Sequence, residues 1–107
     1  MSDSKADYYT RVYQIVSEIP KGKVTTYGAI AGKIGIESGA RMVGYALNNL
    51  IYNTEENVPA HRVVNRLGQL TGKIHFPGDA MKERLLQENV LFIDEDTVDI
   101  ENHFWRP

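Results

Sequence analysis

The sequence predicts a helix-rich α+β domain, a small winged helix-turn-helix, with residues 1–107 forming a single unit. A length of 107 residues suits one hydrophobic core, and a hydrophobic fraction of 42% is typical of globular rather than disordered chains. Two amphipathic helical patterns are joined by about four residues that include a glycine, as in a helix-turn-helix. Turn-forming residues and short β-prone runs follow them and predict the wing.

The first helix is expected near the N-terminus. Apolar residues recur at spacings of three and four between Tyr8 and Ile19, which indicates one stripe of an amphipathic helix. Ser4 and Asp7 resemble a capping box at its start. Pro20 ends the helix, because the residue before a proline leaves the helical conformation.

A second, shorter helix is expected over residues 27–34. It follows a turn at residues 20–23 and a brief extended piece at residues 24–25. Thr26 can cap this helix, because its hydroxyl can accept hydrogen bonds from the exposed amides of the first turn. Gly35 can end it.

A third helix is expected after Ser38, which can cap its start. Helical spacing places on one face Ala40, Val43, Gly44, Leu47 and Ile51. The opposite face carries Arg41, Met42, Tyr45 and Asn48. A face that is merely solvated would carry more glutamate and lysine, so the composition of this outward face is unusual.

The remainder of the chain predicts one more helix and two hairpins. A polar loop spans residues 52–57, and Val63-Val64 and Leu70-Thr71 would be the arms of a hairpin around the turn at residues 65–68. Asp79 can cap a helix that ends near Asn89. Residues 90–93 and 97–100 predict a second hairpin.

Composition excludes several classes of function. The chain has no cysteine and three histidines, without metal-binding spacing, so neither a metal site nor any cofactor is expected. No apolar run is long enough for a membrane partner, and the polar first residues predict a cytoplasmic protein, associated with the nucleoid if it is bacterial. The net charge of −2 conceals an asymmetry: residues 5–73 carry +4 and residues 74–107 carry −5. A nucleic-acid surface in the first part is therefore compatible with the overall acidity.

Three motifs in the same order resemble the O6-alkylguanine-DNA alkyltransferases. They are Ile19-Pro20-Lys21-Gly22-Lys23-Val24-Thr25-Thr26-Tyr27-Gly28, Ala40-Arg41-Met42-Val43-Gly44 and Pro59-Ala60-His61-Arg62-Val63-Val64-Asn65. The third matches the family's Pro-Cys-His-Arg-Val active-site motif with alanine in place of cysteine. Leu85-Leu86-Gln87-Glu88-Asn89-Val90 and the terminal Phe-Trp-Arg-Pro extend the similarity to the alkyltransferase-like proteins, the relatives without that cysteine.

This resemblance implies binding without catalysis. The family transfers an alkyl group from guanine O6 to a cysteine thiolate, and Ala60 has no atom able to accept it. His61 and Glu88 resemble two members of the family's Asn–His–Glu proton relay, whereas the asparagine has no clear match in the loop around residues 50–57. The chain is therefore expected to be no enzyme.

The resemblance also implies how DNA is held. The third helix would enter the minor groove, and the damaged nucleotide would be rotated out of the duplex. Arg41 resembles the family's arginine finger, which fills the vacated space and contacts the orphaned cytosine. Tyr27 matches the tyrosine that helps to rotate the nucleotide. The DNA-binding residues expected on these grounds are Tyr27, Arg41, Thr26, Ser38, Met42 and Tyr45, with Thr26 and Ser38 near phosphates.

The lesion pocket is expected to contain Tyr27, Ala60, His61, Arg62, Val63 and Lys73, with the hairpin of residues 66–73 forming part of its lining. Alanine in place of cysteine widens this pocket, which suggests tolerance of alkyl groups larger than methyl. Lys73 aligns with an arginine that senses the modified guanine edge in alkyltransferase-like proteins. A lysine keeps that charge but lacks the planar fork of donors.

The partners expected from the resemblance are double-stranded DNA containing O6-alkylguanine and nucleotide excision repair proteins of the UvrA type, with the chain acting as a monomer. Two other functions are compatible with parts of the sequence. A general winged-helix regulator would need base-edge readers along its recognition helix, for which only Arg41, Asn48 and Asn49 qualify. A residual enzyme would need water activated by His61.

Overall fold

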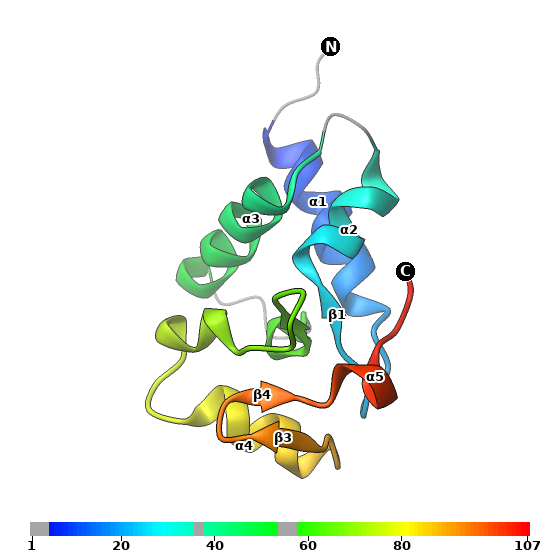
Figure 1. Ribbon diagram of the computed structural model, residues 1–107. Helices are drawn as coiled ribbons and strands as arrows, with labels where there is room; N and C mark the ends of the chain where they lie inside the picture. Colours follow the sequence, from blue (N-terminus) through cyan, green and yellow to red (C-terminus); the bar gives the residue numbers. More distant parts are fainter. Residues whose placement is uncertain (1–4, 36–37, 54–57) are drawn as a thin grey trace.

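The computed structural model describes all residues except 1–4, 36–37 and 54–57. The N-terminal half contains α1 (Lys5–Ser17), β1 (Thr25–Thr26), α2 (Tyr27–Ile34) and α3 (Ala40–Asn53). The C-terminal half contains the short 3-10 helices η1 (Ala60–Arg62) and η2 (Thr71–His75), with β2 (Val63–Val64), α4 (Ala80–Gln87), β3 (Phe92–Asp94), β4 (Thr97–Val98) and α5 (Ile100–His103). The expected helix-rich α+β class is confirmed (Figure 1).

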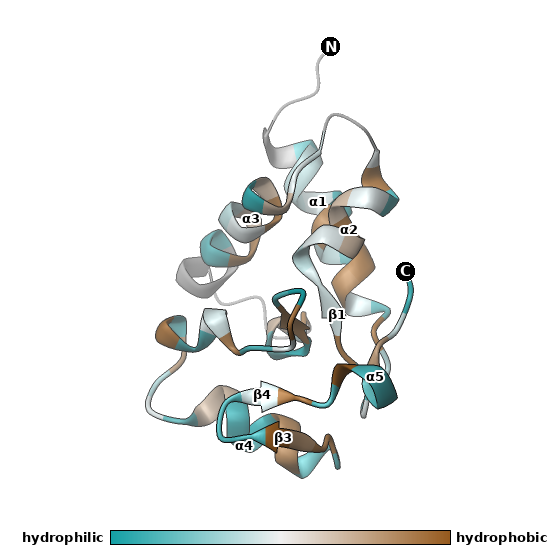
Figure 2. Cartoon of the chain, viewed as in Figure 1, coloured by the Kyte–Doolittle hydropathy of each residue, from teal (hydrophilic) through white to brown (hydrophobic). Residues whose placement is uncertain are grey.

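The N-terminal half is a bundle of α1, α2 and α3 around one apolar cluster. Val12 and Val16 of α1 belong to the predicted stripe together with Ile19, which lies two residues beyond the end of α1, and all three are almost completely buried. They pack against Ile30 of α2 and Val43 of α3 within the same cluster. The apolar residues of α2 stand out in brown in Figure 2.

The ends of α2 follow the sequence prediction, whereas the start of α3 differs from it. Thr26 Oγ1 accepts a hydrogen bond from the Ala29 amide at 3.0 Å, and Gly35 ends α2 with a φ of 141°. The α3 helix instead begins after Gly39, whose carbonyl accepts from the amides of residues 42 and 43. The Ser38 hydroxyl hydrogen-bonds the Tyr8 hydroxyl at 2.5 Å, so it joins α1 to the start of α3. The helix also runs to Asn53, into the predicted loop, of which residues 54–57 lie outside the described part.

Within residues 40–49 of α3, two positions differ from the expected faces, and Ile51, also predicted for the buried face, lies outside the side chains that the structure describes. Ala40 is exposed rather than buried, and Ala46, which was not assigned to the core, is completely buried. Both differences rotate the buried face toward Val43, Ala46 and Leu47. The rotation follows from α3 packing against both α1 and α2, since contact with two helices buries a wider sector than one stripe.

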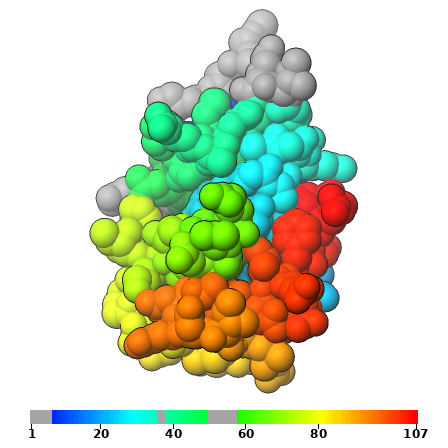
Figure 3. Space-filling view, viewed as in Figure 1, coloured from blue at the N-terminus to red at the C-terminus, as the bar shows by residue number. Residues whose placement is uncertain are grey.

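The predicted first hairpin is wrong. Residues 65–69 do form a tight turn, in which the Gly68 amide donates to the Asn65 carbonyl at 2.9 Å. Its arms do not pair: β2 pairs in parallel with β1, and residues 71–75 form the 3-10 helix η2. The second hairpin is confirmed as the antiparallel pair β3–β4, with shorter strands than expected. In the space-filling view residues 60–70, in green, lie between α2 and the orange β3–β4 hairpin (Figure 3).

A second apolar cluster supports the C-terminal half. It joins Val24 and Val64 to Met81 and Leu85 of α4 and to Val98 of β4. Backbone hydrogen bonds hold the C-terminal segment against Val24 of this cluster. The Val24 amide donates to the His103 carbonyl at 2.9 Å, and the Trp105 amide donates to the Val24 carbonyl at 2.8 Å. In the described part of the chain no helix is long and apolar enough to span a bilayer.

Gly68 occupies a position where the backbone conformation and the close approach of β4 leave no room for a side chain. It has a φ of 89°, and a Cβ added there would lie 2.5 Å from the Val98 carbonyl oxygen. Gly68→Ala is therefore expected to destabilise the fold by about 2–3 kcal/mol through backbone strain and steric overlap. Urea unfolding measures the effect, with Gly32→Ala in the open interior of α2 as the matched control. The control should stabilise by up to about 1 kcal/mol, and a Gly68→Ala protein as stable as the parent would contradict this packing.

Candidate nucleic-acid interface

A pocket of about 540 Å³ lies between α3 and η2. One face of α3 forms the first wall, and η2 forms the opposite wall; Tyr27, Ala60 and Val63 complete the lining. The full lining is Tyr27, Ala40, Arg41, Gly44, Tyr45, Leu47, Asn48, Ala60, Val63, Thr71, Gly72, His75 and Phe76. Three of the six residues predicted for the lesion pocket are therefore brought together here: Tyr27, Ala60 and Val63.

Tyr27 is held in the pocket by η2. Burial raises the pKa of its hydroxyl, and a hydrogen bond with the Thr71 side chain opposes that rise only in part. A Cβ added at Gly72 would lie 3.2 Å from the Tyr27 hydroxyl oxygen, so the absence of a side chain at Gly72 lets η2 approach this hydroxyl. Tyr27 therefore presents a protonated hydroxyl, able to donate a hydrogen bond, at a fixed place in the pocket.

The outward face of α3 carries the predicted contact residues. Arg41 is exposed in the first turn of the helix and lines the pocket edge. Met42 and Tyr45 are exposed by 38% and 56%, which is high for large apolar side chains. An arginine beside exposed aromatic and thioether groups offers both charge and stacking surface to a nucleic acid.

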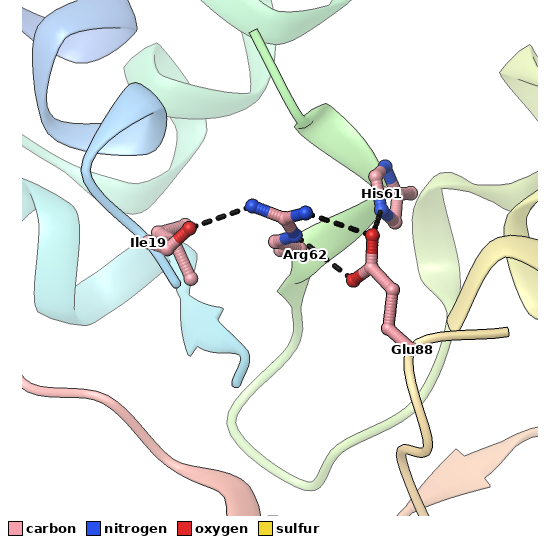
Figure 4. A network of polar contacts seen from close by, with 4 residues as sticks. All are labelled: Ile19, His61, Arg62 and Glu88. Carbon is pink, nitrogen blue, oxygen red and sulfur yellow. Dashed lines mark hydrogen bonds and ion pairs between the residues drawn. The ribbon is translucent and has the colours of Figure 1, made fainter. Parts of the chain in front are cut away.

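His61 and Arg62 are not among the residues that line the pocket, and both contact Glu88 instead (Figure 4). Arg62 Nε and Nη2 donate to the two Glu88 carboxylate oxygens at 2.9 and 2.7 Å. Arg62 Nη1 donates to the Ile19 carbonyl at 2.7 Å, and His61 Nε2 contacts Glu88 Oε2 at 3.0 Å. This network connects η1 to the segment that follows α1 and to the end of α4, and so positions Ala60 and Val63, the neighbours of His61 and Arg62 in the sequence.

The electrostatics of this network fix its protonation. Burial raises the pKa of Glu88, but hydrogen bonds from Arg62 and His61 outweigh burial and lower it to about 2. Burial lowers the pKa of His61, more than the contact with Glu88 raises it. His61 is therefore neutral at pH 7, with its proton on Nε2 where the Glu88 carboxylate accepts it. Its Nδ1 is buried and has no hydrogen-bond partner within the described structure.

Lys73 is placed differently from its predicted position. Its ammonium donates to Asp96 Oδ2 at 2.6 Å, on the turn between β3 and β4, and the residue is not among those lining the pocket. This hydrogen bond raises the pKa of Lys73 and lowers that of Asp96. The predicted hairpin would have turned Lys73 inward, whereas the 3-10 helix η2 turns it toward the acidic β3–β4 turn.

Sequence reasoning assigned only part of the η2 wall to the pocket. Thr71 and Gly72 fall within residues 66–73, which were predicted to border the pocket as a hairpin, whereas His75 and Phe76 were not assigned to it. Because residues 70–71 were interpreted as a strand, the 3-10 helix that brings His75 and Phe76 to the pocket was not expected.

Comparisons with known proteins agree with this geometry. Residues 7–90 match the family model for the DNA-binding domain of 6-O-methylguanine DNA methyltransferase. The chain is also 39% identical over 106 residues to alkyltransferase-like protein 1 of Schizosaccharomyces pombe, covering 94% of this chain and 96% of that protein. The chain belongs to the alkyltransferase-like protein family.

Other relatives of this alkyltransferase-like protein fit the same grouping. The DNA base-flipping protein of Escherichia coli is 40% identical over 99 residues, which are 89% of this chain and 71% of that protein. A crystal structure of the S. pombe protein with damaged DNA containing O6-carboxymethylguanine superimposes with a TM-score of 0.81 at 35% identity, over 100% of both chains. An alkyltransferase variant from Mycobacterium tuberculosis gives a TM-score of 0.60 at 32% identity, over 77% of this chain and 48% of that one.

Proposed function

We propose that this alkyltransferase-like protein is a non-enzymatic sensor of DNA damage. It binds double-stranded DNA containing O6-alkylguanine, rotates the damaged nucleotide into the pocket between α3 and η2, and flags it for nucleotide excision repair. The observation that supports the proposal is the pocket itself, in which Tyr27 and the Arg41 face of α3 lie around Ala60, the residue that the motif resemblance aligns with the family's cysteine.

Rotation of the base follows from the location of the pocket. Guanine O6 lies on the major-groove side of the base pair, whereas α3 is expected to approach from the minor groove, so the pocket can enclose the O6 substituent only after the nucleotide has left the stack. Flipping costs a few kcal/mol and leaves a hole in the duplex. Arg41, exposed at the pocket edge, is the cation placed to fill that hole while the base occupies the pocket.

The groups lining the pocket support binding rather than alkyl transfer. Ala60 offers only a methyl group, and the chain contains no cysteine. The hydroxyls present belong to Tyr27, Tyr45 and Thr71, and hydroxyls that keep their protons are weak nucleophiles. The raised pKa of Tyr27 works against a phenolate. Since the adduct stays on the DNA, its removal must fall to another system, for which we propose nucleotide excision repair proteins of the UvrA type, recruited by a monomer of this chain.

Affinity for matched duplexes tests the binding proposal. Fluorescence anisotropy should give at least about tenfold tighter binding to a duplex with one O6-methylguanine than to the same duplex with guanine. Intact mass spectrometry of the protein from the same mixture should show no added methyl group. Equal affinity for the two duplexes would overturn the proposal, and so would a protein heavier by the adduct.

Ala60→Cys tests whether transfer chemistry is latent in the site. We expect at most a trace of methyl transfer, because the pKa of a catalytic thiol must be lowered by a polarised partner. His61 keeps its contact with Glu88 through Nε2, but the third member of the family's relay, the asparagine, has no clear match in this chain. Mass spectrometry after incubation with O6-methylguanine duplex measures the transfer, with the parent protein as control. Stoichiometric methylation of the variant would show that the remaining groups suffice.

A further inference from the structure

The β3–β4 hairpin has an apolar outer face that the hydrophobic core does not use. Leu91 is 60% exposed and Ile93 is 67% exposed, whereas Phe92 between them packs against the second apolar cluster. Because side chains alternate along a strand, Leu91 and Ile93 lie on the side that faces away from the core. Figure 2 shows β3 mostly in brown and the turn after it in teal. We call Leu91 and Ile93 the outer patch.

Carboxylates border the outer patch at both of its ends. Asp94 and Glu95 follow Ile93, are exposed, and make no ion pair with any residue that the structure describes. Asp99 lies opposite Leu91 across the hairpin, because its amide donates to the Leu91 carbonyl at 2.9 Å, and residues opposite each other in an antiparallel pair share a face. The outer patch is therefore a short apolar strip between negative charges.

The location of the outer patch makes DNA an unsuitable occupant. No residue of β3 or β4 lines the pocket between α3 and η2, and Figure 1 shows the hairpin at the lower end of the molecule, with α3 in the upper half. Residues 74–107 carry a net charge of −5, so this end of the chain repels phosphates. We expect the outer patch to stay accessible when DNA occupies the α3 face.

The same charges disfavour a second copy of this chain. In a two-fold dimer each patch would face its own counterpart, so the carboxylates of Asp94 and Glu95 would approach those of the partner copy. Like charges brought together across an interface oppose association. Charge complementarity instead favours a protein whose apolar contact is surrounded by lysine and arginine side chains.

The function proposed above requires one protein partner, the repair protein that removes the damage. We propose that the outer patch is the docking surface for this nucleotide excision repair protein, which contacts Leu91 and Ile93 with apolar side chains and the bordering carboxylates with basic ones. This inference rests on the proposed function. It assigns DNA and the repair protein to different faces of the chain, so both can be bound at once.

The test of the apolar contact uses the immobilised chain and the purified UvrA-type protein of the organism that encodes it. The double variant Leu91→Thr/Ile93→Thr removes the apolar side chains and replaces them with a residue common in strands. Biolayer interferometry should show affinity for the UvrA-type protein at least about tenfold weaker than that of the parent. Affinity for an O6-methylguanine duplex should not change, because neither residue lines the pocket. Ile74→Thr, the same substitution at a residue of η2 that is 81% exposed, is the matched control and should bind the UvrA-type protein as the parent does.

A second pair of variants tests the charges around the outer patch. Asp94→Asn/Glu95→Gln should lower the association rate constant by about threefold and make the affinity less dependent on salt, because charges at the rim of an interface act mainly on association. Glu18→Gln removes one exposed carboxylate just after α1, away from the hairpin, and should leave both quantities unchanged. A salt dependence equal to that of the parent in Asp94→Asn/Glu95→Gln would contradict a basic partner surface.

The remaining outcomes separate this inference from the proposed function. Unchanged binding of the UvrA-type protein by Leu91→Thr/Ile93→Thr overturns the docking surface, although the parent's binding would still support recruitment. A parent dimer in sedimentation that the double variant dissociates overturns it as well, because a second copy then occupies the patch. A parent that does not bind the UvrA-type protein overturns both the docking surface and recruitment, whereas failure to distinguish O6-methylguanine from guanine contradicts damage sensing itself. If urea unfolding shows that the double variant does not fold, Ile93→Thr alone should still weaken binding by about threefold.

Discussion

Replacing Arg41 by alanine is expected to weaken binding to an O6-methylguanine duplex by about 100-fold, which corresponds to about 2.7 kcal/mol. The guanidinium is the group placed to stack in the space left by the rotated base and to hydrogen-bond the orphaned cytosine, and each such contact contributes about 1–3 kcal/mol. Because Arg41 is exposed, its removal should not change the free energy of unfolding. Anisotropy titrations with damaged and undamaged duplexes measure the effect.

Two further variants distinguish stacking of Arg41 in the vacated space from a general attraction of its positive charge to DNA. Arg41→Lys keeps the positive charge but loses the planar fork, so it should lose affinity for the damaged duplex while keeping most of its affinity for the undamaged one. Arg11→Ala removes an equal charge from an exposed position on α1 and should weaken binding to both duplexes slightly and equally. If Arg41→Ala lost the same factor on both duplexes, Arg41 would be a phosphate contact and not a finger.

Glu88→Gln is expected to have the largest effect on stability, a loss of about 3 kcal/mol at pH 7. The carboxylate accepts two hydrogen bonds from Arg62, whose side chain is only 11% exposed, and a third from His61. Without the charge, a buried guanidinium is left without its counterion. Urea unfolding monitored by circular dichroism measures the loss.

The pH dependence of this loss has a definite sign. The pKa of Glu88 is lowered in the fold to about 2 from an ordinary 4.5, so the charged network stabilises fully above about pH 4.5 and its contribution disappears as the pH falls toward 2. The gap between parent and Glu88→Gln should therefore narrow between pH 5 and pH 3. The lowered pKa of His61 is a separate effect: the parent's own free energy of unfolding decreases as the pH falls below the ordinary 6.5, because unfolding lets the imidazole take up a proton. A gap that stays constant down to pH 3 would contradict the network.

Local patterns in the sequence predict the helices well. The stripe from Tyr8 to Ile19, the Thr26 cap and Gly35 each act through neighbours a few residues away, and the structure has helices at α1 and α2 accordingly. Arg41, Met42 and Tyr45 were predicted to face outward for the same reason, because helical spacing determines the face. The family motifs added Ala60 and Val63, which spacing alone would have left as ordinary apolar residues.

Long-range pairing explains where prediction from the sequence fails. β2 pairs with β1, about 40 residues earlier in the chain, and Leu70 donates its amide to the Asp96 carbonyl at 3.1 Å. No local signal distinguishes these partners from a hairpin closed by the turn at residues 65–68. Lys73 and the η2 wall were misplaced as a consequence.

A crystal structure of this protein with a duplex containing O6-methylguanine tests the central claim most directly. We expect the modified nucleotide to lie outside the helix, with its methyl group intact in the pocket beside Tyr27, Ala60 and Val63, and the Arg41 guanidinium in the space it vacated. A complex in which the O6-methylguanine remains stacked and paired within the duplex would contradict it.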